Sequence, residues 1–542
     1  MPRAKAMIIN TILLSATSLL MRVVGMVFQV WLTRRIGAAG IGLFQLIMSV
    51  SMLAATFAIS GIRFAATRLV SMEISAGRVG GALAAVRRCL IYAAVFGAAA
   101  SLFLWFGAPV IGSVWIGDAR TVLSLRVLSL SLTAYALSAV LAGYFTAVCR
   151  VVKSAAVAVA EQLIRIGVIV LALGVSAGYE LETACAVVVA GGVAGELSSF
   201  ALLAALYLFE KRGSRREKLS RADGRGMTRR MFGIAAPLAL SAYARSALST
   251  LQHLLVPRGL KKSGASSEKA LADYGTVHGM VFPVLMFPSA LFYSFAELVV
   301  PELTDAQVRG DSSRISELVS RSLRLCLLFS VGFMACIWGF GEELGRAVYG
   351  AGETGKYLTG LAWLMPIMYL DSVTDGMLRG LGQQMYSMAY NILDSAVSVT
   401  LVYLLLPRFA LAGYVFMVAF TEIFNFALSI NRLRKTTEIH FSVKTALKAL
   451  FSAFGAVNLT RFLASLSGFP AAPEAGTLAL NISLCFFIYA LLLLLFGCFE
   501  PRETEAAKKF FGGIEKRARA WYTKQSSVSR AARSSLLSKA RK

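Results

Sequence analysis

The sequence predicts an all-α membrane protein that crosses the bilayer many times. Of its 542 residues, 57% are apolar and only 15% are charged, whereas a soluble domain carries about 25% charged residues. Apolar runs long enough to span a bilayer recur from Met7 to Phe499, and none shows the ten-residue alternation of a strand barrel. The first run is broken by Arg22 and lacks a small-residue cleavage site, which argues against a signal peptide.

Fourteen apolar segments are candidates for transmembrane helices, because about 20 apolar residues cross the hydrocarbon core. We expect these helices at residues 7–33, 43–66, 83–107, 122–147, 152–177, 183–209, 231–256, 274–299, 318–341, 357–380, 385–406, 411–431, 443–466 and 476–498. The eighth segment contains Pro283 and Pro288, each of which removes a helix hydrogen bond. We therefore expect that segment to be kinked or locally unwound.

Basic residues in the connections set the expected orientation. The net charge is +26, and the link from Glu210 to Arg230 alone holds nine basic residues. Because Lys and Arg collect on the cytoplasmic side, we expect both termini to be cytoplasmic and the basic segments to attract anionic lipids. The basic tail from Pro501 to Lys542 is consistent with two predictions: a short interfacial helix, or a solvated, disordered segment. No basic–aromatic pattern supports nucleic-acid binding.

Weak internal similarity predicts a duplicated unit. ELSSFAL at Glu196–Leu202 recurs as EIFNFAL at Glu422–Leu428. Further matches at nearby offsets pair Arg22 with Arg245, Arg35 with Arg258, Gly42 with Gly275, Gly77 with Gly310, and Glu161 with Asp394. Parallel repeats pack about an axis along the membrane normal, with a cavity at their interface. The expected domains are lobes at 1–209 and 231–434, a basic linker at 210–230, two added helices within 435–500, and a basic tail at 501–542.

Charges inside the expected spans are the candidate site residues, because a charge at mid-membrane costs about 2.5–3.5 kcal/mol. Glu161 and Arg165 are four residues apart and can form a pair, which either locks helices together or flanks a substrate path. Arg22 and Arg245 have no acidic neighbour within a turn and are candidates for contact with an anionic ligand. Arg63 and Arg68 either snorkel to headgroups or contribute to the same site.

The tenth segment offers a second group of charges. Asp371, Asp375 and Arg379 lie at steps of four on one helix face, so Asp375 can pair with Arg379, which would leave Asp371 less compensated. Asp371 is then a candidate for ion coupling, or a cap near the membrane surface. Four further polar groups occur in both halves and suggest shared packing first: Glu196, Asp394, Glu422 and Asn425.

No catalytic or cofactor chemistry is visible. The three histidines are scattered, and no nucleophile–base pair, phosphate-binding glycine loop or metal-ligand spacing occurs. The seven cysteines lie in or beside apolar runs and read as small core residues. We expect a non-enzyme without cofactor or metal, and transport driven by an ion gradient, the membrane potential or substrate flux.

Three stretches resemble a known family. They are RVVGMVFQVWLTRRIGAAGIGLFQL, LAGYFTAVCRVVKSAAVAVAEQLIRI and LRGLGQQMYSMAYNILD. The chain, over about residues 5–500, is similar to the polysaccharide-export branch of the multidrug/oligosaccharidyl-lipid/polysaccharide flippase superfamily. The most similar family is that of stage V sporulation protein B, which is related to lipid II and O-antigen flippases.

The resemblance implies two six-helix lobes around a central cavity, in a bacterial cytoplasmic membrane. It implies movement of an undecaprenyl-pyrophosphate-linked glycan or peptidoglycan precursor to the outer leaflet, with Na⁺ or H⁺ as the coupling ion where one is used. Arg22 falls on a family arginine, whereas the next basic position falls near Phe28 and Gln29, and Arg245 is the substitute for a missing arginine of the eighth segment. We expect a monomer.

Two alternatives remain open. One is a cation-coupled multidrug exporter of the same superfamily, which requires uncompensated carboxylates in its cavity. The other is a membrane glycan polymerase or ligase, which is expected to expose a long external loop with catalytic residues.

Overall fold

The fold is helical throughout the described residues. The computed structural model describes residues 2–175, 180–213, 226–350, 352–440, 442–466 and 475–499, and these ranges contain no strand. The elements are α1 (Pro2–Ile59), α2 (Ile62–Ser75), α3 (Val79–Val110), η1 (Ile111–Ile116), η2 (Ala119–Thr121), α4 (Val122–Ala147), α5 (Val151–Val175), α6 (Leu181–Gly213), α7 (Met227–Lys262), α8 (Ser267–Tyr274), η4 (Gly275–Val281), α9 (Phe282–Met286), α10 (Ser289–Arg309), α11 (Ser312–Tyr349), α12 (Gly352–Leu361), η5 (Ala362–Leu364), α13 (Met365–Gly380), α14 (Gln384–Thr436), α15 (Val443–Leu466) and α16 (Ala475–Leu495). The predicted all-α class is confirmed.

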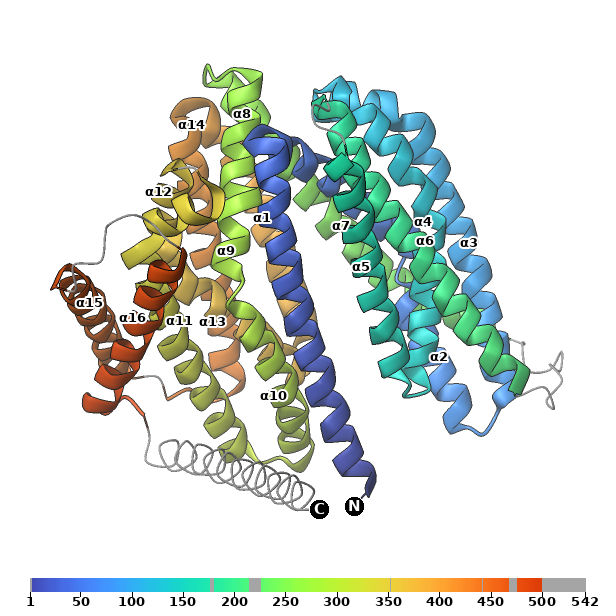
Figure 1. The fold of residues 1–542 in the computed structure, drawn as a ribbon. Coiled ribbons are helices and arrows are strands. Elements are labelled where there is room, and N and C mark those ends of the chain that lie inside the picture. Colours follow the sequence, from blue (N-terminus) through green and yellow to red (C-terminus); the bar gives the residue numbers. More distant parts are fainter. Residues whose placement is uncertain are drawn as a thin grey trace, which may run out of the picture. The chain divides into compact units, whose positions relative to one another are not determined.

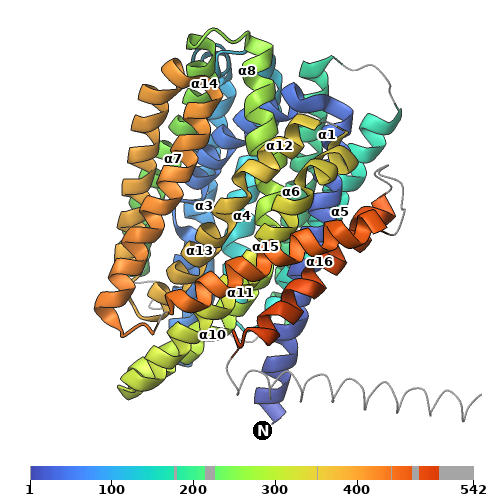
Figure 2. The same cartoon turned by 90° about the vertical axis from the view of Figure 1, so that its left-hand side faces the viewer.

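Ten helices of the described chain are long and apolar enough to cross a membrane, judged by length and composition. Two of them cover two expected segments each. α1 changes direction at Gly37 (φ 71°), and α14 does so at Ala410 (φ 50°), so that the two halves of α14 lie side by side in Figure 2. The eighth and tenth expected segments are divided into shorter helices. The count of fourteen spans therefore stays a prediction.

The predicted break in the eighth segment is confirmed. Residues Gly275–Val281 form the π-helical turn η4, α9 follows with Pro283 in its first turn, and α10 begins after Pro288. Proline cannot donate a backbone hydrogen bond and clashes with the preceding turn, which favours a break of the α-helix here.

Contacts divide the chain into two compact units, of which the larger is Met1–Phe441 with Ala472–Leu478. Within it, α2–α6 pack on one another and form the first bundle, and α8–α14 form the second bundle. α1 contacts both α3 and α4 of the first bundle and α8 and η4 of the second, and it stands between the two bundles in Figure 1. α7 likewise contacts α2, α3 and α14. The two bundles therefore meet mainly through α1 and α7.

Apolar packing fixes α1 against the first bundle. Leu32 and Ile41, on either side of the α1 bend, form a buried cluster with Ile169 of α5 and Val188 of α6. Other large apolar side chains, such as Phe106 on α3, remain exposed on the helix surfaces. Apolar exposure of this extent marks a surface for lipid rather than for water, as a multi-pass membrane protein requires.

The smaller unit, Ser442–Ala471 with Ala479–Lys542, contains α15 and most of α16. Lys448 of α15 donates from Nζ to the Phe496 carbonyl oxygen at 2.8 Å, and Gly455 leaves room for Leu492. The tail at 501–542 and most of the basic linker lie outside the described residues, and so does the expected interfacial helix.

The turn between η1 and α4 is held by an ion pair. Arg120 Nη2 lies 2.6 Å from Asp118 Oδ2, and the backbone amide of Arg120 donates to Asp118 Oδ1. Burial alone would raise the pKa of Asp118, but the hydrogen bonds and charge of Arg120, with Lys261 farther away, lower it below the usual value.

Six of the seven cysteines are buried, as predicted. Cys149 is exposed, and its φ of 57° places it in the left-handed region just before α5. The apolar sequence around Cys149 belongs to the helices that flank a turn, and the turn itself lies at the surface, so this part of the prediction is wrong.

Candidate functional site

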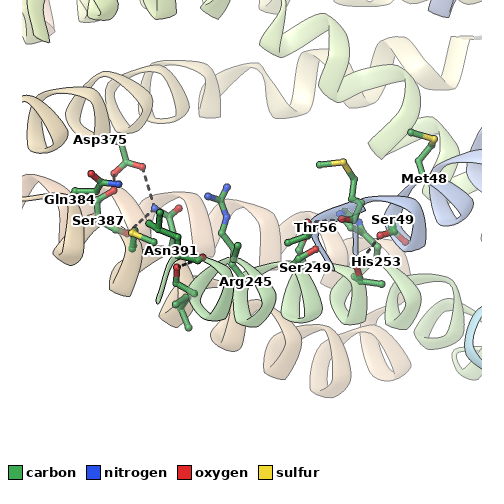
Figure 3. Close-up of a pocket in the computed structure, with 18 of the residues that line it drawn as sticks. Met48, Ser49, Thr56, Arg245, Ser249, His253, Asp375, Gln384, Ser387 and Asn391 are labelled. Carbon is green, nitrogen blue, oxygen red and sulfur yellow. Dashed lines mark hydrogen bonds between the residues drawn. The ribbon is translucent and has the colours of Figure 1, made fainter. Parts of the chain in front are cut away.

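A cavity of about 690 Å³ lies between α1, α7, η4, α13 and α14, as Figure 3 shows. Its walls are unusually polar for the interior of an apolar helical protein. α7 contributes Ser249 and Arg245, α14 contributes Gln384 and Asn391, and α1 contributes Thr56. A volume of this size falls within the range of small-molecule sites, about 300–1,000 Å³.

Two arginines lie in this cavity. Arg245 comes from the middle of α7, and Arg379 comes from the last turn of α13. Both residues are exposed, and neither forms an ion pair with a described residue. Because guanidinium stays protonated at all relevant pH values, the cavity carries two permanent positive charges.

The possible pair between Asp375 and Arg379 does not form. Ser387 Oγ donates to one carboxylate oxygen of Asp375 at 2.9 Å, and Asn391 Nδ2 donates to the other at 3.2 Å. Both donors belong to α14, the next helix, and each occupies one oxygen of the Asp375 carboxylate in place of Arg379. Arg379 is therefore left available in the cavity.

The other end of the cavity carries an aromatic cluster that the sequence analysis missed. His253 Nδ1 lies 3.1 Å from the Tyr274 hydroxyl, and the His253 and His278 rings are 4.4 Å apart. The ring of Tyr274 stacks on His278 at 5.5 Å. His253 and His278 lie on different elements, so their distance along the chain gave no signal that they meet.

Four of the predicted arginines do not line the cavity: Arg22, Arg63, Arg68 and Arg165. Arg22 lies on an exposed stretch of α1, next to the Met21 carbonyl that accepts a hydrogen bond from Gln162 Nε2 of α5. Arg63 and Arg68 are exposed on α2. Arg63 lies close enough to Tyr135 of α4 to act on it electrostatically. The structure thus separates these residues from Arg245 and Arg379.

The predicted pair between Glu161 and Arg165 is confirmed. Arg165 Nη2 lies 2.7 Å from Glu161 Oε1 and 3.6 Å from Glu196 Oε1 of α6. One arginine therefore bridges two carboxylates and ties α5 to α6. This arrangement favours the locking role, since none of the three residues lines the cavity.

A matching cluster in the second bundle has no such arginine among the residues that the structure describes. Asn425 Nδ2 of α14 donates to Asp371 Oδ2 at 3.0 Å, and Asp394 and Glu422 lie within electrostatic range of Asp371. Asp371 Oδ1, Asp394 Oδ1 and Asn425 Oδ1 are buried without a hydrogen-bond partner among the described residues. At the offset that pairs Glu161 with Asp394, Arg165 corresponds to Ser398. The basic partner of the first cluster is thus replaced by a serine.

Two family models match the chain. The model described as polysaccharide biosynthesis protein matches residues 8–307, and the one described as MatE matches residues 263–405. Stage V sporulation protein B of Bacillus subtilis (strain 168) is 25% identical over 406 residues, which are 74% of this chain and 77% of that protein. The uncharacterized membrane protein YabM of the same organism is 22% identical over 330 residues, 60% of this chain and 61% of that one.

Solved structures share the fold at low sequence identity. The lipid II flippase MurJ in an inward closed conformation aligns with a TM-score of 0.65 and 13% identity, covering 90% of this chain and 98% of that chain. A multidrug resistance MATE family transporter in an inward-facing conformation aligns with a TM-score of 0.59 and 13% identity, covering 78% and 98%. At such identities the likeness concerns the arrangement of helices.

Proposed function

Because the chain belongs to the polysaccharide biosynthesis protein family, within the multidrug/oligosaccharidyl-lipid/polysaccharide flippase superfamily, we propose that it moves a lipid-linked glycan across the membrane. The cargo is an undecaprenyl-pyrophosphate-linked glycan or a peptidoglycan precursor of the lipid II kind. It passes from the cytoplasmic to the outer leaflet of the bacterial cytoplasmic membrane, with both termini in the cytoplasm.

One observation carries the proposal: Arg245 and Arg379 share a cavity, and no described carboxylate forms an ion pair with either. Two guanidinium groups in one cavity suit a diphosphate, whose oxygens accept charge-assisted hydrogen bonds from guanidinium. The amide and hydroxyl groups of Gln384, Asn391 and Ser249 provide partners for sugar hydroxyls. The polyprenyl tail stays in the lipid while the polar head occupies the cavity.

Flipping in proteoliposomes tests this role. We expect Arg245→Ala and Arg379→Ala each to lower flipping of a fluorescent polyprenyl-diphosphate disaccharide at least ten-fold, because a hydrogen bond to a charged group contributes about 1.5–3 kcal/mol. Arg→Lys at the same positions restores part of the rate. Arg309→Ala is the matched control, since Arg309 is exposed on α10 and pairs with Asp305 at 2.8 Å. Normal flipping by the double alanine variant would refute the role of the two arginines.

A coupling cation, Na⁺ or H⁺, fits the acidic cluster of the second bundle. Asp371, Asp394 and Glu422 gather there with Asn425 and lack the arginine of the first bundle, so an external cation supplies the missing charge. Asp375 and Arg379, grouped with Asp371 in the sequence, belong to the cavity instead. We expect Asp371→Asn to abolish stimulation of flipping by a Na⁺ or pH gradient. Unchanged stimulation by both gradients would contradict this assignment.

The same cluster and the MatE match at residues 263–405 favour one alternative, a cation-coupled multidrug exporter. Such an exporter needs a carboxylate to meet a cationic drug, and the cavity offers only Asp375 among its described lining residues. Drug sensitivity of a deletion strain separates the two. A broad rise in sensitivity to cationic drugs, with normal wall precursor pools, would favour the exporter.

A further inference from the structure

Two arginines connect the two bundles of the larger unit. Both lie at the end of that unit that is opposite the N-terminus. Arg34 of α1 donates from Nε to the Val348 carbonyl at 2.9 Å and from Nη2 to the Ala347 carbonyl at 2.7 Å, at the end of α11. Arg258 of α7 donates from Nη2 to the Trp115 carbonyl at 2.5 Å, and also to the Val114 carbonyl, at the end of η1. The last carbonyls of a helix lack partners within it and attract cations, so both contacts are favourable.

The carbonyl ends of the two contacts are repeat-equivalent, whereas Arg34 lies one position before Arg35, the residue that the repeat pairs with Arg258. The carbonyl pairs Val114–Trp115 and Ala347–Val348 are separated by the offset that relates Gly42 to Gly275. The left-handed glycines that end these two helices, Gly117 (φ 78°) and Gly350 (φ 71°), share that offset. In each half, then, an arginine from the first helix binds the end of the third helix of the other half.

Gly42 and Gly275 lie where the two halves meet. A Cβ added to Gly275 would lie 2.6 Å from the Gly42 backbone nitrogen and would overlap the Ala38 carbonyl oxygen. A Cβ added to Gly42 would overlap the carbonyl oxygen of Leu271, which has the repeat offset from Ala38. When equivalent positions contact each other reciprocally, they lie on the symmetry axis.

This crossing lies beside one end of the cavity. Gly279, one residue after His278, packs on Ile41 and near Gln45, and Gln29 Nε2 donates to its carbonyl at 3.2 Å. Gln45 and His278 both line the cavity. Figure 1 shows the α1 bend beside α8 at this end of the unit.

We propose that these contacts form one reciprocal seal: the Gly42–Gly275 crossing on the axis, flanked by the Arg34 and Arg258 contacts. The seal closes the cavity toward the outside, and its three parts open together when the bundles rock apart at this end. The glycines permit the closed state because any Cβ there meets backbone. The arginine contacts are made to water-accessible carbonyls, so water can replace them when the seal opens. The proposal rests on the transport function proposed above.

Accessibility labelling tests the seal without any substrate, so its outcome is independent of which cargo is carried. A reporter, Ser246→Cys on the cavity wall, is placed in a chain whose seven native cysteines are replaced. A membrane-impermeant maleimide is then applied to intact cells. We expect slow labelling of the parent. With Gly42→Ala or Gly275→Ala we expect labelling at least five-fold faster, because the closed arrangement cannot form.

The arginine variants extend the test if a glycine variant fails to reach the membrane. Arg34→Gln and Arg258→Gln each speed labelling by a similar, smaller factor, as reciprocal contacts require. The matched controls are Arg35→Gln, whose guanidinium lies over the Trp31 ring, and Gly174→Ala, where a Cβ meets nothing within 4 Å. A parent that is already labelled rapidly, or seal variants that label no faster than the controls, would overturn the proposal.

Discussion

Replacing Arg165 by glutamine is expected to destabilise the first bundle strongly. The change removes the only basic group that pairs with Glu161 and Glu196 among the described residues. The side chains of the two glutamates are 20% and 19% exposed, so water cannot take over the role of the arginine. The two carboxylates would then face each other across the contact of α5 with α6.

The size of the effect follows from burial. Breaking a fully buried ion pair costs about 3–5 kcal/mol, and breaking an exposed one costs about 0–1 kcal/mol. The carboxylates are mostly buried but the Arg165 side chain is 38% exposed. We therefore expect a loss of about 2–3 kcal/mol in the free energy of unfolding. Adding Glu161→Gln and Glu196→Gln removes the uncompensated charges and should restore at least half of that loss.

Equilibrium unfolding in mixed detergent micelles, followed by tryptophan fluorescence, measures these differences. Arg309→Gln is the matched control, because Arg309 and Asp305 have the same i, i+4 spacing at 2.8 Å but are 72% and 61% exposed. That change should cost less than about 1 kcal/mol. If Arg165→Gln cost no more than the control, or if the triple variant were the least stable of all, the charge-balance reasoning would be wrong.

Two further outcomes are expected in the same unfolding assay. The lowered pKa of Asp118 means that the ion pair with Arg120 stabilises the fold above the ordinary carboxyl pKa of about 3.9 and is lost as the pH falls. Arg120→Gln should thus cost up to about 1 kcal/mol at pH 7, and progressively less as the pH falls below about 3.9; a difference that does not change with pH would contradict this. Ala410→Gly should raise the free energy of unfolding by about 1 kcal/mol, because Ala410 has a φ of 50° at the bend of α14 and glycine adopts such a backbone without strain. A lower free energy of unfolding in this variant would exclude backbone strain at Ala410.

Local spacing in the sequence predicted the structural features that depend on a single helix. The i, i+4 step gave the Glu161–Arg165 pair, and the prolines at 283 and 288 gave the broken eighth segment, because both effects act within a few residues. The long apolar runs were enough to predict the helical membrane class.

Contacts between helices escaped prediction. The same i, i+4 rule failed for Asp375, because its partners Ser387 and Asn391 come from another helix. Arg22 and Arg245 looked equivalent in the sequence, yet only Arg245 lines the cavity. A helix that is apolar on all sides gives no signal of how it is rotated about its own axis, so sequence alone could not tell which arginine faces inward.

The position of Gly42 and Gly275 also constrains how the two halves can have diverged. Everywhere else in a duplicated unit, a substitution made in both copies creates two separate changes in two separate places. At this crossing, the added atom of each copy meets the backbone of the other copy. In a homodimer of identical subunits, a larger residue at this position would create two steric clashes at the same interface contact. Fusion into a single chain lets one half change alone, but a Cβ in either half still meets the backbone of the other.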